Sequence, residues 1–148
     1  MFSLQFFVFV FFLTGNLLGL VYDPDIKNHP EANTFVTWAL NKLMVAIHSR
    51  NYDEIRNLLH ADFRYKGCDS IENRETYTNA FALMPDKMSL SFELTAFGAD
   101  NTTTSLIVFK AVFTAKMDKE ERTSLVQMTF DKNLRVFTQG ETLDCQMN

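Results

Sequence analysis

The chain has 148 residues, a net charge of −4 and 47% hydrophobic residues. The hydrophobic residues are unevenly distributed: residues 1–22 carry six of the 15 phenylalanines, whereas all 14 basic and all 18 acidic side chains lie beyond them. The remainder has the ordinary composition of one soluble domain, which excludes a disordered, collagen-like, coiled-coil or multi-span membrane protein. Because the net charge is negative and no stripe of basic residues occurs, we expect neither nucleic acid nor an anionic membrane as a partner.

Residues 1–20 have the layout of a secretory signal peptide, with a polar start, a dense apolar stretch and small residues before the first polar segment. The start lacks Lys and Arg and no A-x-A pair marks the cut, so only the small residue Gly19 indicates cleavage nearby. An uncleaved anchor is the alternative, since an uncharged stretch of this length could span a bilayer. Gly15, Asn16 and Gly19 interrupt the stretch and favour cleavage. Residues 21–148 would then form a single domain outside the cytosol, without membrane contact.

The first half of that domain has helical periodicity. Pro30 suits the first turn of a long helix that should end near Ser49, and Asn28 with Glu31 forms a capping pair before it. A second cap at Asn51 opens a short helix, and residues 63–65 alternate as a short strand. A third helix should run from about residue 74 to Pro85.

In the second half of the domain, apolar residues recur at every second position, as in β-strands. Residues 88–95 alternate, residues 107–117 form the longest alternating series, and the charged run 118–122 is a solvated hairpin turn. Residues 126–130 and a last strand from Leu134 to about Thr138 complete the pattern. We therefore expect an α+β fold in which three helices cover the concave face of an antiparallel sheet.

Few side chains indicate catalysis. There is no nucleotide-binding, nucleophile-elbow, zinc-protease or calcium-loop motif, so no cofactor and no metal is expected. His48 and His60 are each predicted in the last turn of a helix, where a cation offsets the helix dipole, and a metal pair is disfavoured. Asp62 and Tyr65 are the catalytic candidates, although a carboxylate at a strand entrance more often caps a turn.

Two covalent modifications are expected outside the cytosol. Cys68 and Cys145 lack metal-ligand spacing, so an oxidising compartment favours a disulfide between them, and buried free thiols are the alternative. Asn101 begins the single N-x-T sequon, within a polar run that should be an exposed turn, so it is a candidate glycosylation site.

The order of long helix, short helix, short strand, helix and meander resembles the nuclear transport factor 2-like superfamily, also called SnoaL-like or ketosteroid-isomerase-like. The stretches 46–55 and 58–63 are similar to its first helix, polar turn and short second helix, and residues 130–136 to its final hairpin. The leader and the two cysteines look most like small secreted members with no assigned activity. The resemblance implies a cone-shaped fold.

The resemblance also implies which catalytic groups are missing. Aligned with the isomerase, its general base falls near Gly67, its oxyanion tyrosine near Leu43 and its proton-donating aspartate near Val126. None of these side chains can transfer a proton, so the chemistry of that enzyme has no apparatus here.

We therefore expect a secreted, non-catalytic domain that binds a small hydrophobic ligand or a protein partner. The alternative is a lyase, isomerase or hydrolase that uses Asp62 with Tyr65 or a histidine, and a cystatin-like inhibitor is disfavoured because the Q-x-V-x-G hairpin is absent. Tyr65 and Tyr77 could direct hydroxyls into a cavity, although core packing explains them equally well. The candidate pocket residues share an inward, mostly apolar position: Leu43, Tyr65, Tyr77, Phe81, Phe92, Phe109, Phe113 and Met128.

The outer face of the sheet is the expected partner surface. Leu106, Val108, Val112 and Phe137 should lie there among Lys110 and Thr114. Because related cones often pair through this face, the resemblance implies a homodimer.

Overall fold

Three α-helices precede the long strands in the computed structural model, which describes residues 21–98 and 104–145. They are α2 (Pro30–His48), α3 (Tyr52–Asn57) and α4 (Arg74–Ala82), and a short 3-10 helix, η1 (Ile26–Asn28), precedes α2. The proposed leader and Asn101 lie outside the described residues. Within those residues, no helix is long and apolar enough to cross a membrane.

The three helices begin where the sequence predicts, but one of the expected caps is not formed. Asn51 caps α3 by accepting from the amide of Glu54 at 3.2 Å, and Pro30 is the first residue of α2. The expected Asn28 cap is wrong, because the side-chain Nδ2 of Asn28 donates to the Asp23 carboxylate at 3.0 Å and His29 takes the N-cap position without a side-chain bond. His60 is also not helical, since the strand β2 begins at Leu59.

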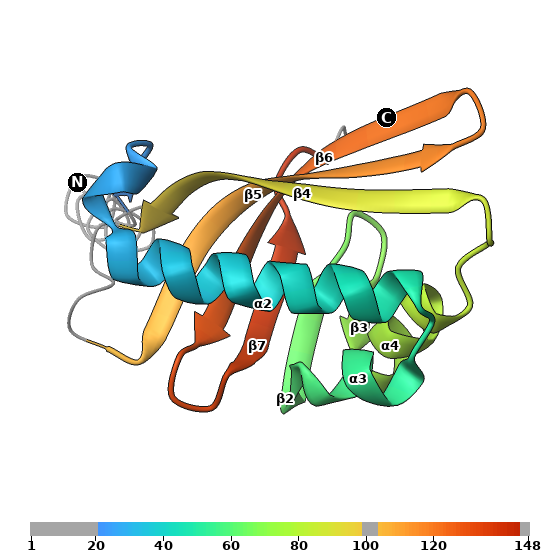
Figure 1. The fold of residues 1–148 in the computed structure, drawn as a ribbon, viewed down its shortest axis with the longest axis horizontal. Helices are drawn as coiled ribbons and strands as arrows, with labels where there is room; N and C mark the ends of the chain where they lie inside the picture. Colours follow the sequence, from blue (N-terminus) through green and yellow to red (C-terminus); the bar gives the residue numbers. More distant parts are fainter. Residues whose placement is uncertain (1–20, 99–103, 146–148) are drawn as a thin grey trace, which may run out of the picture.

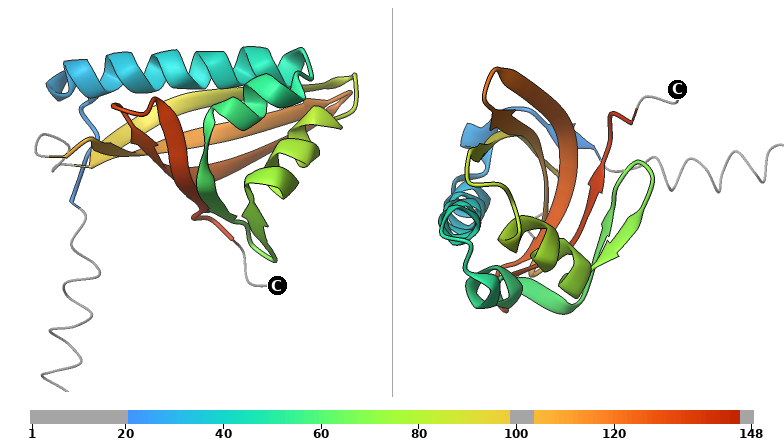
Figure 2. Two further views of the ribbon diagram at one scale, coloured as in Figure 1. Left: turned by 90° about the horizontal axis from the view of Figure 1, so that it is seen from below. Right: turned by 90° about the vertical axis from the view of Figure 1, so that its right-hand side faces the viewer.

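The strands form one seven-stranded sheet in the order β1-β4-β5-β6-β7-β2-β3. Figure 1 shows α2 crossing this sheet, and Figure 2 shows the sheet curving around the helices. The expectation of an antiparallel sheet is wrong at one point, because β2 runs parallel to β7. The bounds are β1 (Tyr22–Asp23), β2 (Leu59–Lys66), β3 (Ile71–Asn73), β4 (Met88–Gly98), β5 (Leu106–Met117), β6 (Glu120–Asp131) and β7 (Val136–Thr142).

A bulge in β7 changes which side chains face the helices. Phe130 pairs with Phe137 whereas Thr129 pairs with Gln139, so the intervening residue of β7 has no partner on β6. Phe137 therefore turns inward, fully buried, and its ring lies 5.3 Å from that of Phe130. The expectation that Phe137 lies on the outer face is wrong for this reason.

The core lies between α2 and the concave face of the sheet. Val36, Leu43 and Ile47 of α2 are fully buried, as the helical stripe predicts. The largest fully buried side chains are phenylalanines from five of the strands: Phe63, Phe97, Phe109, Phe130 and Phe137.

The start of α4 has the strongest local cap. The Asn73 side chain accepts from the amides of Glu75 at 2.9 Å and Thr76 at 3.0 Å, and the Thr76 hydroxyl accepts from the Asn73 amide. Asn73→Ala should therefore lower the free energy of unfolding by about 1 kcal/mol in urea denaturation. Asn73→Asp, which keeps an accepting side chain, should retain most of the stability, and equal losses in both variants would contradict the capping role.

Candidate functional site

A pocket of about 180 Å³ opens between α4 and the sheet, toward the end of β5 that lies nearer its hairpin with β6. Tyr77, Val126 and Met128 are its buried residues, and the other lining residues are partly exposed. The volume is only slightly larger than that of an engineered cavity of about 150 Å³ that holds benzene. The lining comes from β2, α4, β4, β5, β6 and β7: Tyr65, Tyr77, Phe81, Phe92, Phe113, Ser124, Val126, Met128 and Thr142.

Five of the lining side chains form a continuous aromatic run. Tyr65 lies 5.1 Å from Tyr77, measured between ring centroids, and Tyr77 lies 4.8 Å from Phe81. Phe81 then faces Phe113 edge-on at 6.4 Å, and Phe113 contacts Phe92 at 5.0 Å. Tilted and edge-to-face contacts at these distances are attractive and fix the rings relative to each other. The run gives the pocket a rigid apolar wall.

The polar groups of the lining are hydroxyls. The Tyr65 hydroxyl shares a hydrogen bond with the Thr142 hydroxyl at 2.9 Å. Burial raises the pKa of Tyr65, and this hydrogen bond only partly offsets the effect. Burial also raises the pKa of Tyr77. Both tyrosines therefore stay protonated at neutral pH and cannot serve as bases.

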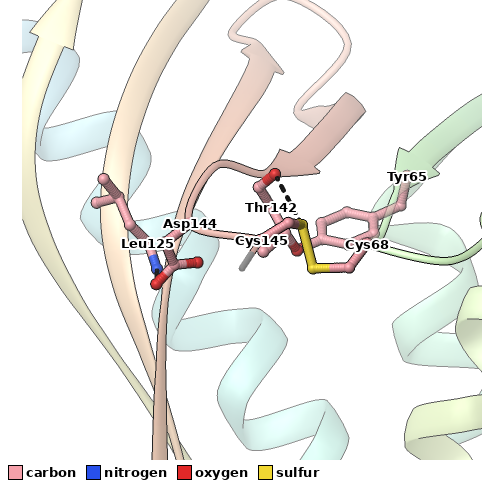
Figure 3. The surroundings of a disulfide bond; sticks show 6 residues. All are labelled: Tyr65, Cys68, Leu125, Thr142, Asp144 and Cys145. Atoms are coloured by element: carbon pink, nitrogen blue, oxygen red, sulfur yellow. Dashed lines mark hydrogen bonds between the residues drawn. A yellow bond between two sulfur atoms is a disulfide. The ribbon is translucent and has the colours of Figure 1, made fainter. Parts of the chain in front are cut away.

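A disulfide fixes one wall of the pocket. Cys68 follows β2 and Cys145 follows β7, and their sulfurs are bonded with a Cα–Cα distance of 5.4 Å. Figure 3 shows the Tyr65 ring and Thr142 beside this bond. On the same C-terminal segment, the Asp144 carboxylate accepts from the Leu125 amide at 2.9 Å. The disulfide prediction agrees with the structure, and the bond joins the two strands that carry Tyr65 and Thr142.

Gly140 makes room for the Tyr65 ring. A Cβ atom at position 140 would lie 2.7 Å from Tyr65 Cδ2, which is closer than such atoms approach in proteins. Gly140→Ala should therefore displace the ring, break the bond to Thr142 and lower the free energy of unfolding by about 1–3 kcal/mol. Urea denaturation measures the loss.

The matched control for this substitution is Gly67→Ala. The nearest atoms to a Cβ there lie 3.5 Å away, so the change in stability should stay within about 0.5 kcal/mol. Equal stability of the two variants would show that the contact with Tyr65 does not constrain position 140.

Most of the predicted pocket residues come together, but two do not. Tyr65, Tyr77, Phe81, Phe92, Phe113 and Met128 all line the pocket. Leu43 and Phe109 are fully buried in the core instead and do not line the pocket. Ser124, Val126 and Thr142 were not predicted. The register of the β5–β6 hairpin would have identified the first two, because it places Phe113 opposite Ser124 and Ala111 opposite Val126.

The proposed acid and base groups do not converge on the pocket. Asp62 is exposed, and its amide donates to His60 Nδ1 at 3.1 Å. His48 Nε2 accepts from the amide of Leu90 at 3.2 Å. Neither histidine nor Asp62 is among the described lining residues. Within the described residues, no three His, Cys, Asp or Glu side chains are placed to hold a metal ion.

The three residues aligned with the isomerase's catalytic groups have no side chain that can transfer a proton, and only one of them lines the pocket. Val126 lines the pocket with an aliphatic side chain, whereas Leu43 is in the core. Gly67 lies beyond β2, where its amide donates to the Ser70 carbonyl at 2.9 Å.

A larger hollow of about 460 Å³ lies on the outer face of the sheet. Several of its polar side chains already have partners: Gln127 binds the Tyr22 hydroxyl and Glu141, Gln139 donates to Thr129 at 3.4 Å, and Arg64 donates to the Phe63 carbonyl at 2.8 Å, whereas Lys66 is exposed. The pocket beside α4 is more apolar and is lined by five aromatic rings. We therefore take it as the candidate ligand site.

A protein-family model described as an NTF2-like domain matches residues 33–147. No curated protein matches the sequence. The match covers the helices α3 and α4, most of α2 and all strands from β2 to β7.

Solved structures show the same fold at low sequence identity. An NTF2-like protein of unknown function from Shewanella oneidensis has a TM-score of 0.63 at 12% identity, covering 76% of this chain and 98% of that one. An NTF2-like protein from Cytophaga hutchinsonii has a TM-score of 0.59 at 14% identity, covering 74% and 95%. An LEH-like epoxide hydrolase of M. tuberculosis has a TM-score of 0.54 at 14% identity, covering 74% and 81%.

Proposed function

The chain belongs to the NTF2-like family, and from this premise we propose that it is a secreted, non-catalytic protein that binds a small apolar ligand in the pocket between α4 and the sheet. The observation that carries the proposal is the lining itself: it is mainly aromatic and aliphatic, and none of its described residues carries a charge. The helices and the curved sheet would together form a cone around this pocket.

The volume sets the size of the ligand. Pockets for drug-sized ligands usually measure about 300–1,000 Å³, and this one measures about 180 Å³. A single ring with a short substituent fits, whereas a sterol or a fatty acid would have to displace the wall. The ligand class is therefore narrower than the composition of the lining alone suggests.

Catalysis is the alternative function, and the lining supports it less well. One structural neighbour is an epoxide hydrolase, so the fold is compatible with hydrolysis. An enzyme of the lyase, isomerase or hydrolase type needs a proton donor or acceptor near neutral pKa in the pocket. Asp62 is exposed elsewhere, and burial raises the pKa of Tyr65. Binding without turnover is the function that these side chains support best.

Blocking the pocket from its rim tests the binding function. Ser124 faces the pocket, and its neighbour Leu125 pairs with Val112 on the outer face of the sheet. Wild-type protein should bind benzene, toluene or indole saturably, with a ligand-induced rise in melting temperature, and palmitate and cholesterol should bind weakly. Ser124→Trp should abolish the binding, and Leu125→Trp should preserve it. Absence of saturable binding of any one-ring compound to the wild-type protein would refute the proposal.

Secretion is supported by two features of the chain. The apolar segment before residue 21 has the layout of a signal peptide, and the disulfide is typical of oxidising compartments. Expression of the full chain in a secretory host should release the protein with an N-terminus near residue 20. The same material would show by mass whether Asn101 is glycosylated. Retention of the intact leader in a membrane fraction would favour the anchor.

We also propose that the outer sheet face forms a homodimer. Leu106 of β5 is 40% exposed there and Val112 is partly buried, although Lys110 already lies 3.9 Å from the Tyr22 ring centroid. Sedimentation should give a dimer at micromolar concentration and a monomer for Val112→Asp. A monomer mass for the wild-type protein would exclude this pairing.

A further inference from the structure

One tyrosine in the pocket has a hydroxyl without a partner. Tyr77 of α4 is only 6% exposed, and the described residues give its hydroxyl no hydrogen bond. Yet no fully buried side-chain oxygen or nitrogen in the described part of the chain lacks a partner. The Tyr77 oxygen therefore borders open space, and the space beside this residue is the pocket that it lines.

The ring of Tyr77 is held firmly in place. Three aromatic rings surround it, with centroid distances of 5.0 Å to Phe63, 5.1 Å to Tyr65 and 4.8 Å to Phe81. Phe63 and Phe81 meet it edge-on, at interplanar angles of 61° and 63°. A hydroxyl on a ring packed in this way is oriented before a ligand arrives, which reduces the entropy lost on binding.

The Tyr65 hydroxyl, unlike that of Tyr77, already has a hydrogen-bond partner. It shares a hydrogen bond with Thr142 at 2.9 Å, so a ligand would have to compete with Thr142 for this hydroxyl. Tyr77 has no such competitor. An apolar molecule that filled the pocket would cover the Tyr77 hydroxyl and leave it unsatisfied, which costs free energy in a buried site.

We infer that the Tyr77 hydroxyl is the polar anchor of the pocket and that the ligand is a small, neutral ring compound with one hydrogen-bond acceptor. The inference rests on the proposed ligand-binding function and names the class of ligand. The acceptor is a carbonyl, ether or hydroxyl oxygen, to which Tyr77 donates. The ligand is neutral because the described lining offers no cation to pair with a buried anion and no carboxylate to pair with a buried cation.

The matched pair cyclohexanone and methylenecyclohexane isolates this hydrogen bond. The two molecules have nearly the same shape, and only the ketone has an acceptor. Binding of each to the secreted protein is measured by titration calorimetry or ligand-observed NMR. Tyr77→Phe removes the hydroxyl and keeps the ring, so it should weaken cyclohexanone roughly three- to tenfold and change methylenecyclohexane less than twofold.

Tyr65→Phe is the control variant, because its hydroxyl is occupied by Thr142. It should change the ratio of the two affinities less than Tyr77→Phe does. If both compounds bind the wild-type protein and Tyr77→Phe affects them equally, the anchor is wrong while the binding function stands. If neither they nor the one-ring compounds tested above bind, the binding function itself fails.

A structure of the wild-type complex covers the case in which Tyr77→Phe does not fold. The cyclohexanone oxygen should lie within about 3.2 Å of Tyr77 Oη, the usual range for a hydrogen bond. An oxygen bound at Tyr65 or Ser124, or one facing solvent, would overturn the assignment.

Discussion

Replacing Cys68 and Cys145 together with alanine is expected to lower the free energy of unfolding by about 2–5 kcal/mol. The bond joins residues 77 positions apart, and in the chain-entropy model a loop of that length contributes about 4.5 kcal/mol by restricting the unfolded chain. Urea denaturation of the double variant measures the change. Wild-type protein in a reducing agent should show the same midpoint, because the same bond is broken.

The disulfide prediction extends to the pocket. Cys68 lies three residues after Tyr65 and Cys145 three residues after Thr142, so the bond holds together the strands that share the hydroxyl pair. Loss of the bond should therefore weaken ligand binding under conditions in which the variant remains folded. A stability change below about 1 kcal/mol would mean that β2 and β7 hold this wall without covalent help.

The second large effect is expected at Phe137. Its side chain is fully buried and contacts the rings of Phe130 and Phe109 at centroid distances of 5.3 and 6.4 Å. Phe137→Ala should therefore cost about 3–5 kcal/mol in urea denaturation, the usual range for a buried phenylalanine.

Leu106→Ala is the control for this prediction. Leu106 lies on the outer face and is 40% exposed, so its truncation should change stability by no more than about 1 kcal/mol. If the two losses were similar, the inward position of Phe137 would be incorrect, and the simple alternation of the sequence would describe β7 better than the bulge does.

The alternation of apolar and polar residues predicts where strands lie. It predicts which side chains face inward only as far as the next bulge. The longest alternating series corresponds to β5, where Phe109 and Phe113 face inward as expected. A bulge shifts the inside–outside alternation by one residue, and the bulge in β7 moved Phe137 from the predicted outer face into the core. No local residue pattern marks this insertion, because its geometry depends on the partner strand.

The parallel pairing of β2 with β7 was beyond local sequence signals. The pairing joins segments about as distant in sequence as the two cysteines, for example Tyr65 with Gly140. The cysteine spacing was the only indication that these regions meet. Thr142 was missed as a lining residue because the last strand was predicted to end at about Thr138, whereas β7 continues to Thr142.

The apolar character of the candidate pocket could be predicted from the sequence, but not which residues line it. Periodicity identifies the inward face but not the portion of it that a helix covers. Phe109 shares that face with Phe113, and Leu43 lies on the buried side of α2, yet Phe109 and Leu43 are fully buried whereas Phe113 is partly exposed. Separating core from lining requires the positions of α2 and α4 on the sheet, which only the folded structure provides.

The parallel pair also determines the order in which this protein can fold. β4, β5 and β6 are neighbours in sequence and can pair as soon as they leave the ribosome, but β2 must wait for β7. Until then β2 and β3 have no bond to the rest of the sheet, and the aromatic wall that carries Tyr65 is open to solvent. Pairing over such a distance is slow, because a long loop must close before any contact forms. Newly made chains should therefore pass through a stage with an incomplete sheet, in which Cys68 has not yet met Cys145 and can form a disulfide with a cysteine of another molecule.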